Sequence, residues 1–435
     1  MSDNKGKKVP KGRVSRFARL TKLAGGVAGG MLAEGGRRIR SGETLNKRDL
    51  LLTPGNAKRV SDELAKMRGA AMKIGQLLSM DAGDLLPKEL TDTLARLQSD
   101  AAPMPWGQLE EVLEKNYGQE WQELFYQFDD KPIAAASIGQ VHRAISVDGQ
   151  ELALKIQYPG IAESIDADVD NVASLLKLTG LLPADLDFEP LLAVAKKQLH
   201  AEADYRQEAE YLCRYTENIG SQPYALPAHI ESLSTDKILA MTFVRGQTVE
   251  AMQRLPQAVR NKAMQQLFAL FMQELFDWRL MQTDPNFANY QFQTQKQQWV
   301  LLDFGACRDI PAKLSKAYLA LFKAGAKNDR KKMAKAIQAL GYFAGEPSDE
   351  YREAVIDIFS VVTQPLRDGG ELDLASSTMV KEMHDLGQEL QQRLDEWSVP
   401  PADILFIHRK IGGLYMLAAR LKAKVNVSEV MAAYI

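Results

Sequence analysis

Three polar residues that could bind a metal ion follow apolar segments in the second half of the chain. Asp284 and Asn289 lie in "TDPNFAN", and Asp303 opens "DFG" directly after the apolar run "WVLL". Carboxylate and amide oxygens are the ligands that Mg²⁺ prefers in proteins. Phosphoryl transfer from a nucleotide needs this metal, a cation for the phosphates and a polar residue beside the nucleophile. We therefore predict that Asn289 and Asp303 are metal ligands and that Asp284 is a catalytic residue.

Each of these motifs has an ordinary structural explanation when it is taken alone. Asp, Pro and Asn are common in polar turns, and DFG is only a tripeptide. However, D-x-x-x-x-N followed by DFG, with "VLLDFG" typical of a buried strand that runs into a loop, is the order found in kinase-like sites. The combination favours a catalytic role over a simple turn.

A lysine that could bind the phosphates lies in "ELALKIQ", which has the pattern of a strand. Lys155 would be costly in this apolar run without an acidic partner. The segment "HAEADYRQEAEYL" offers Glu202, Asp204 and Glu208. Asp204 and Glu208 are four apart and share a helix face, while Glu202 lies roughly 120° round the helix from Glu208. We choose Glu208 as the partner of Lys155 and predict that both are catalytic residues, with Glu202 and Asp204 facing another group. A solvated acidic face would equally explain any one of the three.

Residues 53–80 have the pattern of an amphipathic helix that opens with a capping Thr before Pro. Its apolar stripe, which we expect to be buried, consists of Val60, Leu64, Met67, Ala71, Ile74 and Leu78.

The opposite side of this helix carries Lys73 and Gln76, together with Gly69. Such a side normally faces solvent. A glycine inside a helix costs about 1 kcal/mol, so Gly69 indicates the close approach of another element. We infer that Lys73 and Gln76 press onto the nucleotide site and that Lys73 meets Glu202 or Asp204.

The strand and helix patterns predict an α+β protein-kinase-like fold with two lobes, a small antiparallel sheet lobe and a helical lobe. We expect helix up to Phe128, three strands in 131–160, helices in 161–180 and 189–216, a hairpin in 225–246 and mainly helix afterwards. The expected domains are a basic arm (1–50), a helical extension (51–130), an N-lobe with inserted helices (131–245) and a helical C-lobe (246–435).

The first turn of the expected sheet is "AAASIGQ", where an ordinary kinase has a glycine-rich loop. Alanine restricts φ and adds a Cβ, so this loop cannot approach phosphates as a glycine turn does. We expect a different mode of nucleotide binding there. The expected nucleotide-binding residues are Ala134, Ala135, Ala136, Ser137, Lys155, Met241, Phe243, Lys73, Gln76, Glu202 and Asp204.

Composition sets broad limits. The net charge of -2 over 435 residues is unevenly placed, because residues 1–50 hold 13 Lys and Arg against 4 Asp and Glu. This basic arm is either a solvated tail or a contact with anionic headgroups. Its uncharged core, 23–33, is too short to span a membrane, which takes about 20 residues. The two cysteines lack metal-ligand spacing, and the five histidines form no HExxH pattern.

Several motifs together resemble the UbiB family of atypical protein-kinase-like kinases and ATPases of coenzyme Q (ubiquinone) biosynthesis. "KIGQ" (73–76) matches the KxGQ signature, "AAAS" (134–137) the Ala-rich loop and "EAD" (202–204) the ExD motif. "TDPNFAN" (283–289) resembles the catalytic loop of the branch that contains the mitochondrial coenzyme Q proteins.

The resemblance implies binding of Mg²⁺ with ATP or ADP, ATPase activity, and a KxGQ extension that covers the site and blocks protein phosphorylation. It further implies an anionic membrane surface, coenzyme Q precursor lipids and ubiquinone-biosynthesis proteins as partners, with no nucleic acid. The chain enters helix directly after "DFGACRDIP", without an A-P-E segment to dock a protein substrate. We expect a peripheral location on the cytoplasmic face of a bacterial inner membrane, with the mitochondrial matrix face as the alternative.

Two functions remain open at this point. One is an ATPase that supports coenzyme Q assembly at a membrane surface. The other is a catalytically idle pseudokinase, in which nucleotide stabilises a scaffold or a lipid-binding protein. Retention of the three metal-site residues favours the first. Transfer of phosphate to a small molecule or a protein is a third, less favoured hypothesis.

Overall fold

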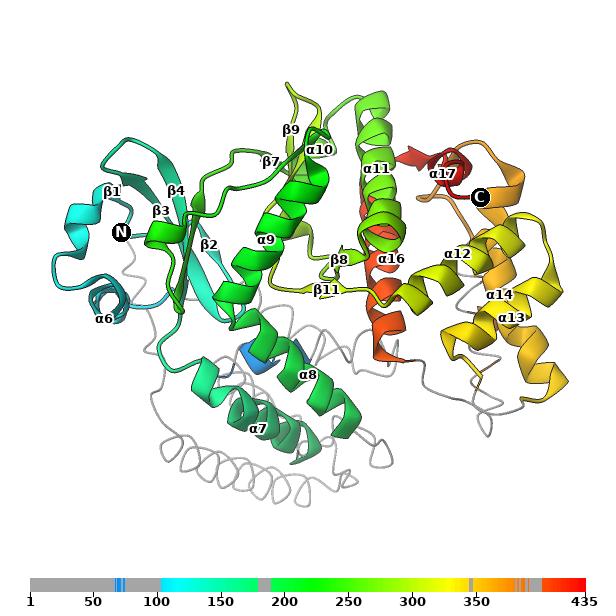
Figure 1. Ribbon diagram of the computed structural model, residues 1–435, viewed down its shortest axis with the longest axis horizontal. Coiled ribbons are helices and arrows are strands. Elements are labelled where there is room, and N and C mark those ends of the chain that lie inside the picture. The colour runs from blue at the N-terminus through cyan, green and yellow to red at the C-terminus, as the bar shows by residue number, and fades with distance from the viewer. Residues whose placement is uncertain are drawn as a thin grey trace, which may run out of the picture. The chain divides into compact units, whose positions relative to one another are not determined.

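A computed structural model gives the fold of most of the chain after residue 102 (Figure 1). The described residues are 67, 69–71, 73–74, 103–178, 189–343, 347–379, 382, 385–387, 390 and 401–435. They divide into two compact units. The first unit comprises the described residues up to Glu210 and Ala228–Phe243, and the second comprises Tyr211–Pro227 and Val244–Ile435. The basic arm lies outside the described residues.

The first unit is built around an antiparallel sheet with the order β1-β3-β4-β6, and β2 pairs with the start of β3. The strands are β1 (Phe125–Phe128), β2 (Ala134–Ala135), β3 (Gly139–Ser146), β4 (Glu151–Gln157) and β6 (Ile238–Thr242). The turn from β3 to β4 contains Gly149 at φ 86°, a conformation that favours glycine. The three strands predicted in 131–160 are therefore confirmed.

The two faces of this sheet differ in chemistry because side chains alternate along each strand. One face carries Ala144, Leu152, Leu154, Ile156 and Ala240, which pack with α6 (Trp106–Tyr117) and the 3₁₀ helix η2 (Trp121–Leu124) in an apolar core. Val141, Lys155 and Leu239 are aligned across three strands and so lie on the opposite face. The sheet thus separates its core from the face that carries the lysine.

Two sequence predictions fail in this unit. Residues 125–128 form β1 rather than helix, and they pair with β3. Phe125 and Phe128 pack against Trp121, so tertiary contacts outweigh the helical pattern. The helix predicted over 189–216 is two helices, α8 (Glu189–Glu202) and α9 (Tyr205–Ile219). The chain breaks there because Asp204 accepts a hydrogen bond from the Gln207 amide and caps the second helix.

Further helices in the described part of the first unit include η3 (Ala162–Ser164), α7 (Ile165–Leu178) and η4 (Glu231–Leu233). The hairpin predicted in 225–246 is only partly formed. Within this segment, the described pairing of β6 is a single bridge between His229 and Met241.

The second unit is mainly helical, as predicted for the region after residue 246. Its helices are α10 (Val249–Met252), α11 (Gln257–Met272), α12 (Ala312–Ala326), α13 (Arg330–Leu340), α14 (Asp349–Asp368), α16 (Ala402–Arg420) and α17 (Val427–Met431). Side-chain caps start several of them, including Asp329 for α13 and Ser348 for α14. Proline at the position before Ala402 and before Ala312 sets the entry to α16 and α12.

Short strands in the second unit hold the loops that contain the predicted metal site. One sheet has the order β5-β10-β9-β7, and a two-stranded sheet pairs β8 with β11. The strands are β5 (Tyr224–Ala225), β7 (Gln247–Thr248), β8 (Leu280–Gln282), β9 (Tyr290–Gln293), β10 (Gln298–Leu301) and β11 (Cys307–Asp309), and β12 (Leu372–Asp373) pairs separately with β13 (Lys424–Val425). The buried strand predicted before DFG is β10.

None of the described helices combines the length and the apolar character that a membrane-spanning segment requires. Cys213 is exposed and Cys307 is buried, and no disulfide joins them.

Candidate functional site

Lys155 and Glu208 form the ion pair that was predicted from the sequence. The Lys155 ammonium donates to both carboxylate oxygens of Glu208, each at 2.8 Å. Both residues are buried, at 7% and 2% exposure, so the charges can be accommodated only as a pair. Glu208 lies in the first turn of α9, where the helix dipole favours a carboxylate. The pairing is confirmed, whereas the role of the pair in nucleotide binding stays a prediction.

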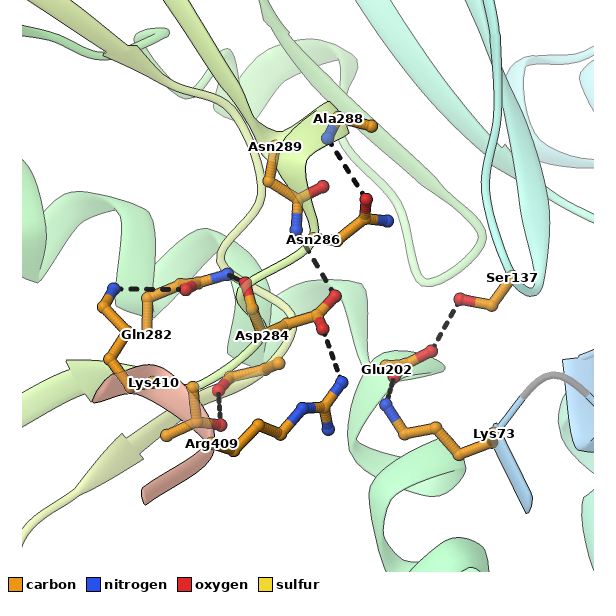
Figure 2. Close-up of polar contacts among 12 residues, drawn as sticks. Lys73, Ser137, Glu202, Gln282, Asp284, Asn286, Ala288, Asn289, Arg409 and Lys410 are labelled. Carbon is orange, nitrogen blue, oxygen red and sulfur yellow. Dashed lines mark hydrogen bonds and ion pairs between the residues drawn. The ribbon is translucent and has the colours of Figure 1, made fainter. Parts of the chain in front are cut away.

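Glu202, the last residue of α8, links two of the motifs selected from the sequence (Figure 2). One carboxylate oxygen pairs with the Lys73 ammonium, and the other accepts a 2.7 Å hydrogen bond from the Ser137 hydroxyl. Lys73 is only 3% exposed. The predicted contact between Lys73 and Glu202 is confirmed. The structure gives Asp204 another role, because its carboxylate caps α9.

The helix that carries Lys73 lies directly against the Ala-rich loop. A Cβ on Gly69 would lie 2.9 Å from the Ser137 carbonyl oxygen, which explains the glycine as a point of close approach. Met67, Ala71 and Ile74 are buried, as predicted for the apolar stripe. Gln76 lies outside the described residues.

The Ala-rich loop forms a tight turn at the start of the sheet. Ala134 and Ala135 pair with β3 in β2, and the Ala136 amide donates to the Gly139 carbonyl at 2.9 Å. Gly139 is itself required, because a Cβ there would lie 3.0 Å from the Ile156 carbonyl carbon and closer still to its oxygen. The turn is therefore closed by backbone hydrogen bonding without a run of glycines.

Met241 and Phe243, also predicted to contact a nucleotide, lie at the end of β6. Met241 is aligned with Ala153 and therefore shares the sheet face of Lys155. The Phe243 amide donates to the Glu151 carbonyl at 2.8 Å. The Arg143 guanidinium lies 5.7 Å from the centre of the Phe243 ring. Met241 is placed on the predicted face, and Phe243 lies just beyond the strand.

In the second unit, backbone hydrogen bonds join the two loops that carry Asp284, Asn289 and Asp303. The Thr283 amide donates to the Ala306 carbonyl at 3.1 Å, and the Thr283 hydroxyl donates to the same oxygen at 2.7 Å. The Leu302 amide donates to the Asn289 carbonyl at 3.1 Å. Two segments of the chain are thus fastened to each other on both sides of the predicted metal site.

The three predicted side chains lie on these joined loops. The Asn289 amide nitrogen donates to an Asp284 carboxylate oxygen at 3.4 Å, as Figure 2 shows, and Asp303 accepts from the Gly305 amide at 3.0 Å. Asn289 and Asp303 line the same small cavity. The Asp303 carboxylate and the Asn289 amide oxygen, on adjoining loops, are donors that suit Mg²⁺. The described residues contain no group of three or more His, Cys, Asp and Glu arranged for a metal, so this site would depend on the amide oxygen.

Arg409, which the sequence analysis did not select, binds the predicted catalytic carboxylate. A terminal nitrogen of Arg409 on α16 donates to the Asp284 carboxylate at 2.6 Å (Figure 2). The side chains are 7% and 18% exposed. A charge-assisted hydrogen bond of this length fixes the direction of the carboxylate.

A second cation of α16, Lys410, belongs to a buried polar network that contacts both ends of the loop carrying Asp284. Lys410 pairs with Glu274 at 3.3 Å and donates to the Tyr290 hydroxyl at 3.2 Å, while the Tyr215 hydroxyl donates to Glu274 at 2.9 Å. Burial alone would lower the pKa of Lys410, but the Glu274 carboxylate outweighs it and raises that pKa above the usual lysine value. Glu274 lies in a π-helical turn, Gln273–Trp278, a feature often found near functional sites.

The sequence held a weak signal for these residues. "FIHRKIGGLYML" places two cations and two glycines inside an apolar helix. Buried cations need acidic partners and helical glycines indicate close approach. The segment could have been selected on that basis, but its acidic partners Asp284 and Glu274 are more than 120 residues away and no local pattern identifies them.

Comparisons with known proteins identify the family of this chain. Residues 96–337 match the ABC1 atypical kinase-like domain. The chain is 35% identical over 429 residues to the atypical kinase coq-8, mitochondrial, of Caenorhabditis elegans. The matched region covers 96% of this chain and 56% of that protein. The chain is also 36% identical over 423 residues to the atypical kinase COQ8B, mitochondrial, of Rattus norvegicus. That matched region covers 96% of this chain and 80% of the relative.

Among solved structures, the complex of Rv3197 with erythromycin from Mycobacterium tuberculosis matches with a TM-score of 0.59 and 22% sequence identity, covering 86% of this chain and 93% of the other. This likeness concerns the fold alone, and the predicted α+β protein-kinase-like class is confirmed. The motifs, the fold and the relatives lead to one assignment: the chain belongs to the ABC1 atypical kinase-like family, the UbiB-type kinases that its motifs resemble.

Proposed function

We propose that this protein binds a Mg²⁺-nucleotide complex and hydrolyses ATP. The observation that carries the proposal is the joining of two loops in the second unit, which brings Asp284, Asn289 and Asp303 together although 14 residues separate the last two. A polar turn without function would not require a second carboxylate at the neighbouring loop. The UbiB resemblance gives these positions the same roles.

Each proposed residue has a distinct task. Asn289 and Asp303 would hold Mg²⁺, which supplies charge neutralisation at the phosphate oxygens when it is bound. Asp284 would orient the attacking water through a carboxylate that Arg409 holds in place. Lys155, kept in position by Glu208, would provide the cation for the phosphates. Glu202, Lys73 and Ser137 would fix the Ala-rich loop that covers the nucleotide.

Phosphate release separates this proposal from an idle pseudokinase. We expect Mg²⁺-dependent release from ATP, stimulated by anionic liposomes, to fall at least about tenfold in Asp303→Asn, because a metal ligand loses its charge. Nucleotide binding is measured separately, since a ligand at 100 times its Kd adds about 2.7 kcal/mol to the free energy of unfolding. A rise in melting temperature with release no faster than in Asp303→Asn would instead support the nucleotide-stabilised scaffold.

Phosphate transfer to another molecule is tested in the same preparation. With γ-labelled ATP, hydrolysis alone predicts label in free phosphate only. Label on an added protein or small molecule, absent with Asp303→Asn, would replace the ATPase assignment with a kinase.

We further propose that the protein supports coenzyme Q biosynthesis as a peripheral protein on a membrane surface, with precursor lipids and biosynthetic proteins as partners. The support is the family resemblance and the charge of residues 1–50, which hold 13 Lys and Arg against 4 Asp and Glu. The Caenorhabditis elegans and Rattus norvegicus relatives are both named as mitochondrial proteins. For this chain, a bacterial inner membrane remains our proposal, with the mitochondrial matrix face as the alternative.

Two measurements test the membrane part. Deletion of residues 1–45 should abolish pelleting with anionic liposomes, and unchanged pelleting would remove the arm from the proposal. Cells that lack the protein should have less ubiquinone, restored by the unaltered protein and not by Asp303→Asn. Equal restoration by both would show that the role in quinone synthesis does not need the metal site.

A further inference from the structure

We propose that Arg409, Lys410 and Gly413 of α16 are positioning residues that hold Asp284 in its working geometry. This inference deepens the proposed function and rests on it, because it assumes that Asp284 acts beside the nucleophile. The three residues occupy a short stretch of one helix, and Arg409 and Gly413 are four apart and so share a helix face. Each makes a different contact with the segment 282–285.

Arg409 holds the side chain of Asp284. The 2.6 Å bond to one carboxylate oxygen leaves the other at 3.4 Å from the Asn289 amide nitrogen. The carboxylate is therefore fixed from two directions, by a residue 125 positions away and by a residue of its own loop. Since both ion-pair partners are mostly buried, this bond is screened little by solvent.

Lys410 holds the backbone of the same residue through Gln282. The Lys410 ammonium lies 3.4 Å from the Gln282 side-chain oxygen, and the Gln282 amide nitrogen donates to the Asp284 carbonyl at 2.8 Å. Figure 2 shows Arg409 and Lys410 on α16 reaching Asp284 and Gln282. Gln282 can orient its amide in this way because the cation fixes its oxygen. Side chain and backbone of Asp284 thus depend on adjacent residues of α16.

Gly413 allows the helix to approach the loop closely enough for these bonds. A Cβ at this position would lie 2.7 Å from Cγ of Pro285 and closer still to its Cβ, and Pro285 directly follows Asp284. Glycine inside a helix is unfavourable without such a reason. A Cβ on the neighbouring Gly412 would meet no atom of the described residues within 4 Å. Of the two adjacent glycines, Gly413 is buried against the loop, whereas Gly412 is only partly buried and has room for a Cβ.

The pair Gly413→Ala and Gly412→Ala tests the inference with matched substitutions. We expect Gly413→Ala to displace Pro285 and to lower kcat for phosphate release by about tenfold or more, with KM for Mg-ATP nearly unchanged, because small displacements of a catalytic group are costly. Gly412→Ala should retain the kcat of the unaltered protein. Hydrogen exchange of residues 281–292 should accelerate only in Gly413→Ala.

A second set of variants tests the inference independently, in case Gly413→Ala fails to fold. Arg409→Met should lower kcat to a similar degree, and Arg409→Lys should recover part of it because the charge remains. Arg367→Met is the control, since Arg367 donates to the Gly325 and Ser360 carbonyls and not to the loop. It should alter neither kcat nor exchange of residues 281–292.

The outcomes keep the inference and the proposed function apart. If the unaltered protein releases phosphate but Gly413→Ala and Arg409→Met match their controls in kcat, the positioning role is wrong and the ATPase stands. If the unaltered protein releases none, the ATPase proposal fails, and hydrogen exchange alone decides whether α16 holds the loop. Unchanged exchange in both variants overturns the inference in either case.

Discussion

The two units stabilise their buried charges in different ways. In the first unit, the Lys155 ammonium has both oxygens of one carboxylate, Glu208, at the same 2.8 Å distance. In the second unit, Glu274 receives hydrogen bonds or ion pairing from Tyr215 and Lys410 at 2.9 and 3.3 Å. Lys410 also contacts the Tyr290 hydroxyl and the Gln282 side chain, so it connects Glu274 to the segment next to Asp284.

The difference shows that Lys155 and Lys410 would serve the proposed reaction in different ways, one directly and the other through intermediate residues. Lys155 is itself the group that would meet the phosphates, and Glu208 only has to keep it charged and directed. The Lys410 network contacts Gln282, next to the loop that carries Asp284, and would act through Gln282 on the backbone of Asp284. Loss of Lys410 therefore removes the cation from Glu274 and a donor from Gln282, whereas loss of Lys155 removes the cation from Glu208.

The largest effect is expected for Lys410→Met. Glu274 would remain fully buried without its cation, and breaking a buried pair in this way costs about 3–5 kcal/mol. We expect the free energy of unfolding, measured in urea, to fall by that amount. The double variant Lys410→Met with Glu274→Gln should recover most of it. A loss below about 1 kcal/mol for the single variant would mean that the network tolerates the unpaired charge.

Lys155→Met should be somewhat less damaging to stability. The carboxylates that would remain are equally buried, at 1% side-chain exposure, but Glu208 lies in the first turn of α9, where the helix dipole partly compensates its charge. We expect a loss of about 3 kcal/mol in urea unfolding, together with weaker nucleotide stabilisation. Adding Glu208→Gln should restore stability without restoring nucleotide binding. If it restored both, Lys155 would have no role beyond neutralising Glu208.

Acidification should weaken the second unit through His408, the neighbour of Arg409. Its ring stacks on Tyr342, and burial lowers its pKa from 6.5 to about 4. The unfolded state then binds more protons between these values, so stability falls as the pH drops through this window. Between pH 7.5 and pH 5 the loss amounts to at most about 2 kcal/mol.

Urea unfolding of His408→Gln at both pH values checks this. The variant should lose the His408 contribution and keep that of other groups such as His142 in the first unit, whose pKa burial also lowers. An unchanged pH dependence would show that His408 titrates normally in the folded protein.

The smallest effect is expected at the contact between the Lys73 helix and the Ala-rich loop. Gly69→Ala places a Cβ 2.9 Å from the Ser137 carbonyl oxygen, a backbone atom that cannot turn away. We expect a net loss of about 1 kcal/mol although alanine is the better helix former. Gly107→Ala in α6, where no described atom lies within 4 Å of the added Cβ, is the matched control and should be neutral or stabilising. Equal behaviour of both would mean that the helix can shift away from the loop.

Residues that act close to their own motif could be predicted from the sequence. Lys155 in an apolar strand demanded a carboxylate, and Glu208, chosen from three candidates in one segment, is the partner in the structure. Gly69 indicated a close approach, and the approach is to the Ala-rich loop. The order of Asp284, Asn289 and Asp303 indicated two adjoining loops, and backbone bonds join them.

Other features depended on partners that no local pattern names. Residues 125–128 became a strand because β3 offered an edge and Trp121 a packing surface. The break at Asp204 depended on whether its carboxylate capped a new helix or faced Lys73. Both outcomes are compatible with the sequence, and only contacts formed on folding choose between them.

By itself the sequence determined which chemistry is available: a buried lysine that needs a carboxylate, three oxygen-bearing side chains at kinase-like spacing, and a glycine-poor first turn. The tertiary structure decided that Asp284 is held by Arg409 and that Lys410 supports its backbone through Gln282. Side-chain type and short-range spacing are encoded locally. A contact across 125 residues exists only when two packed elements meet, and nothing in either segment alone specifies its distant partner.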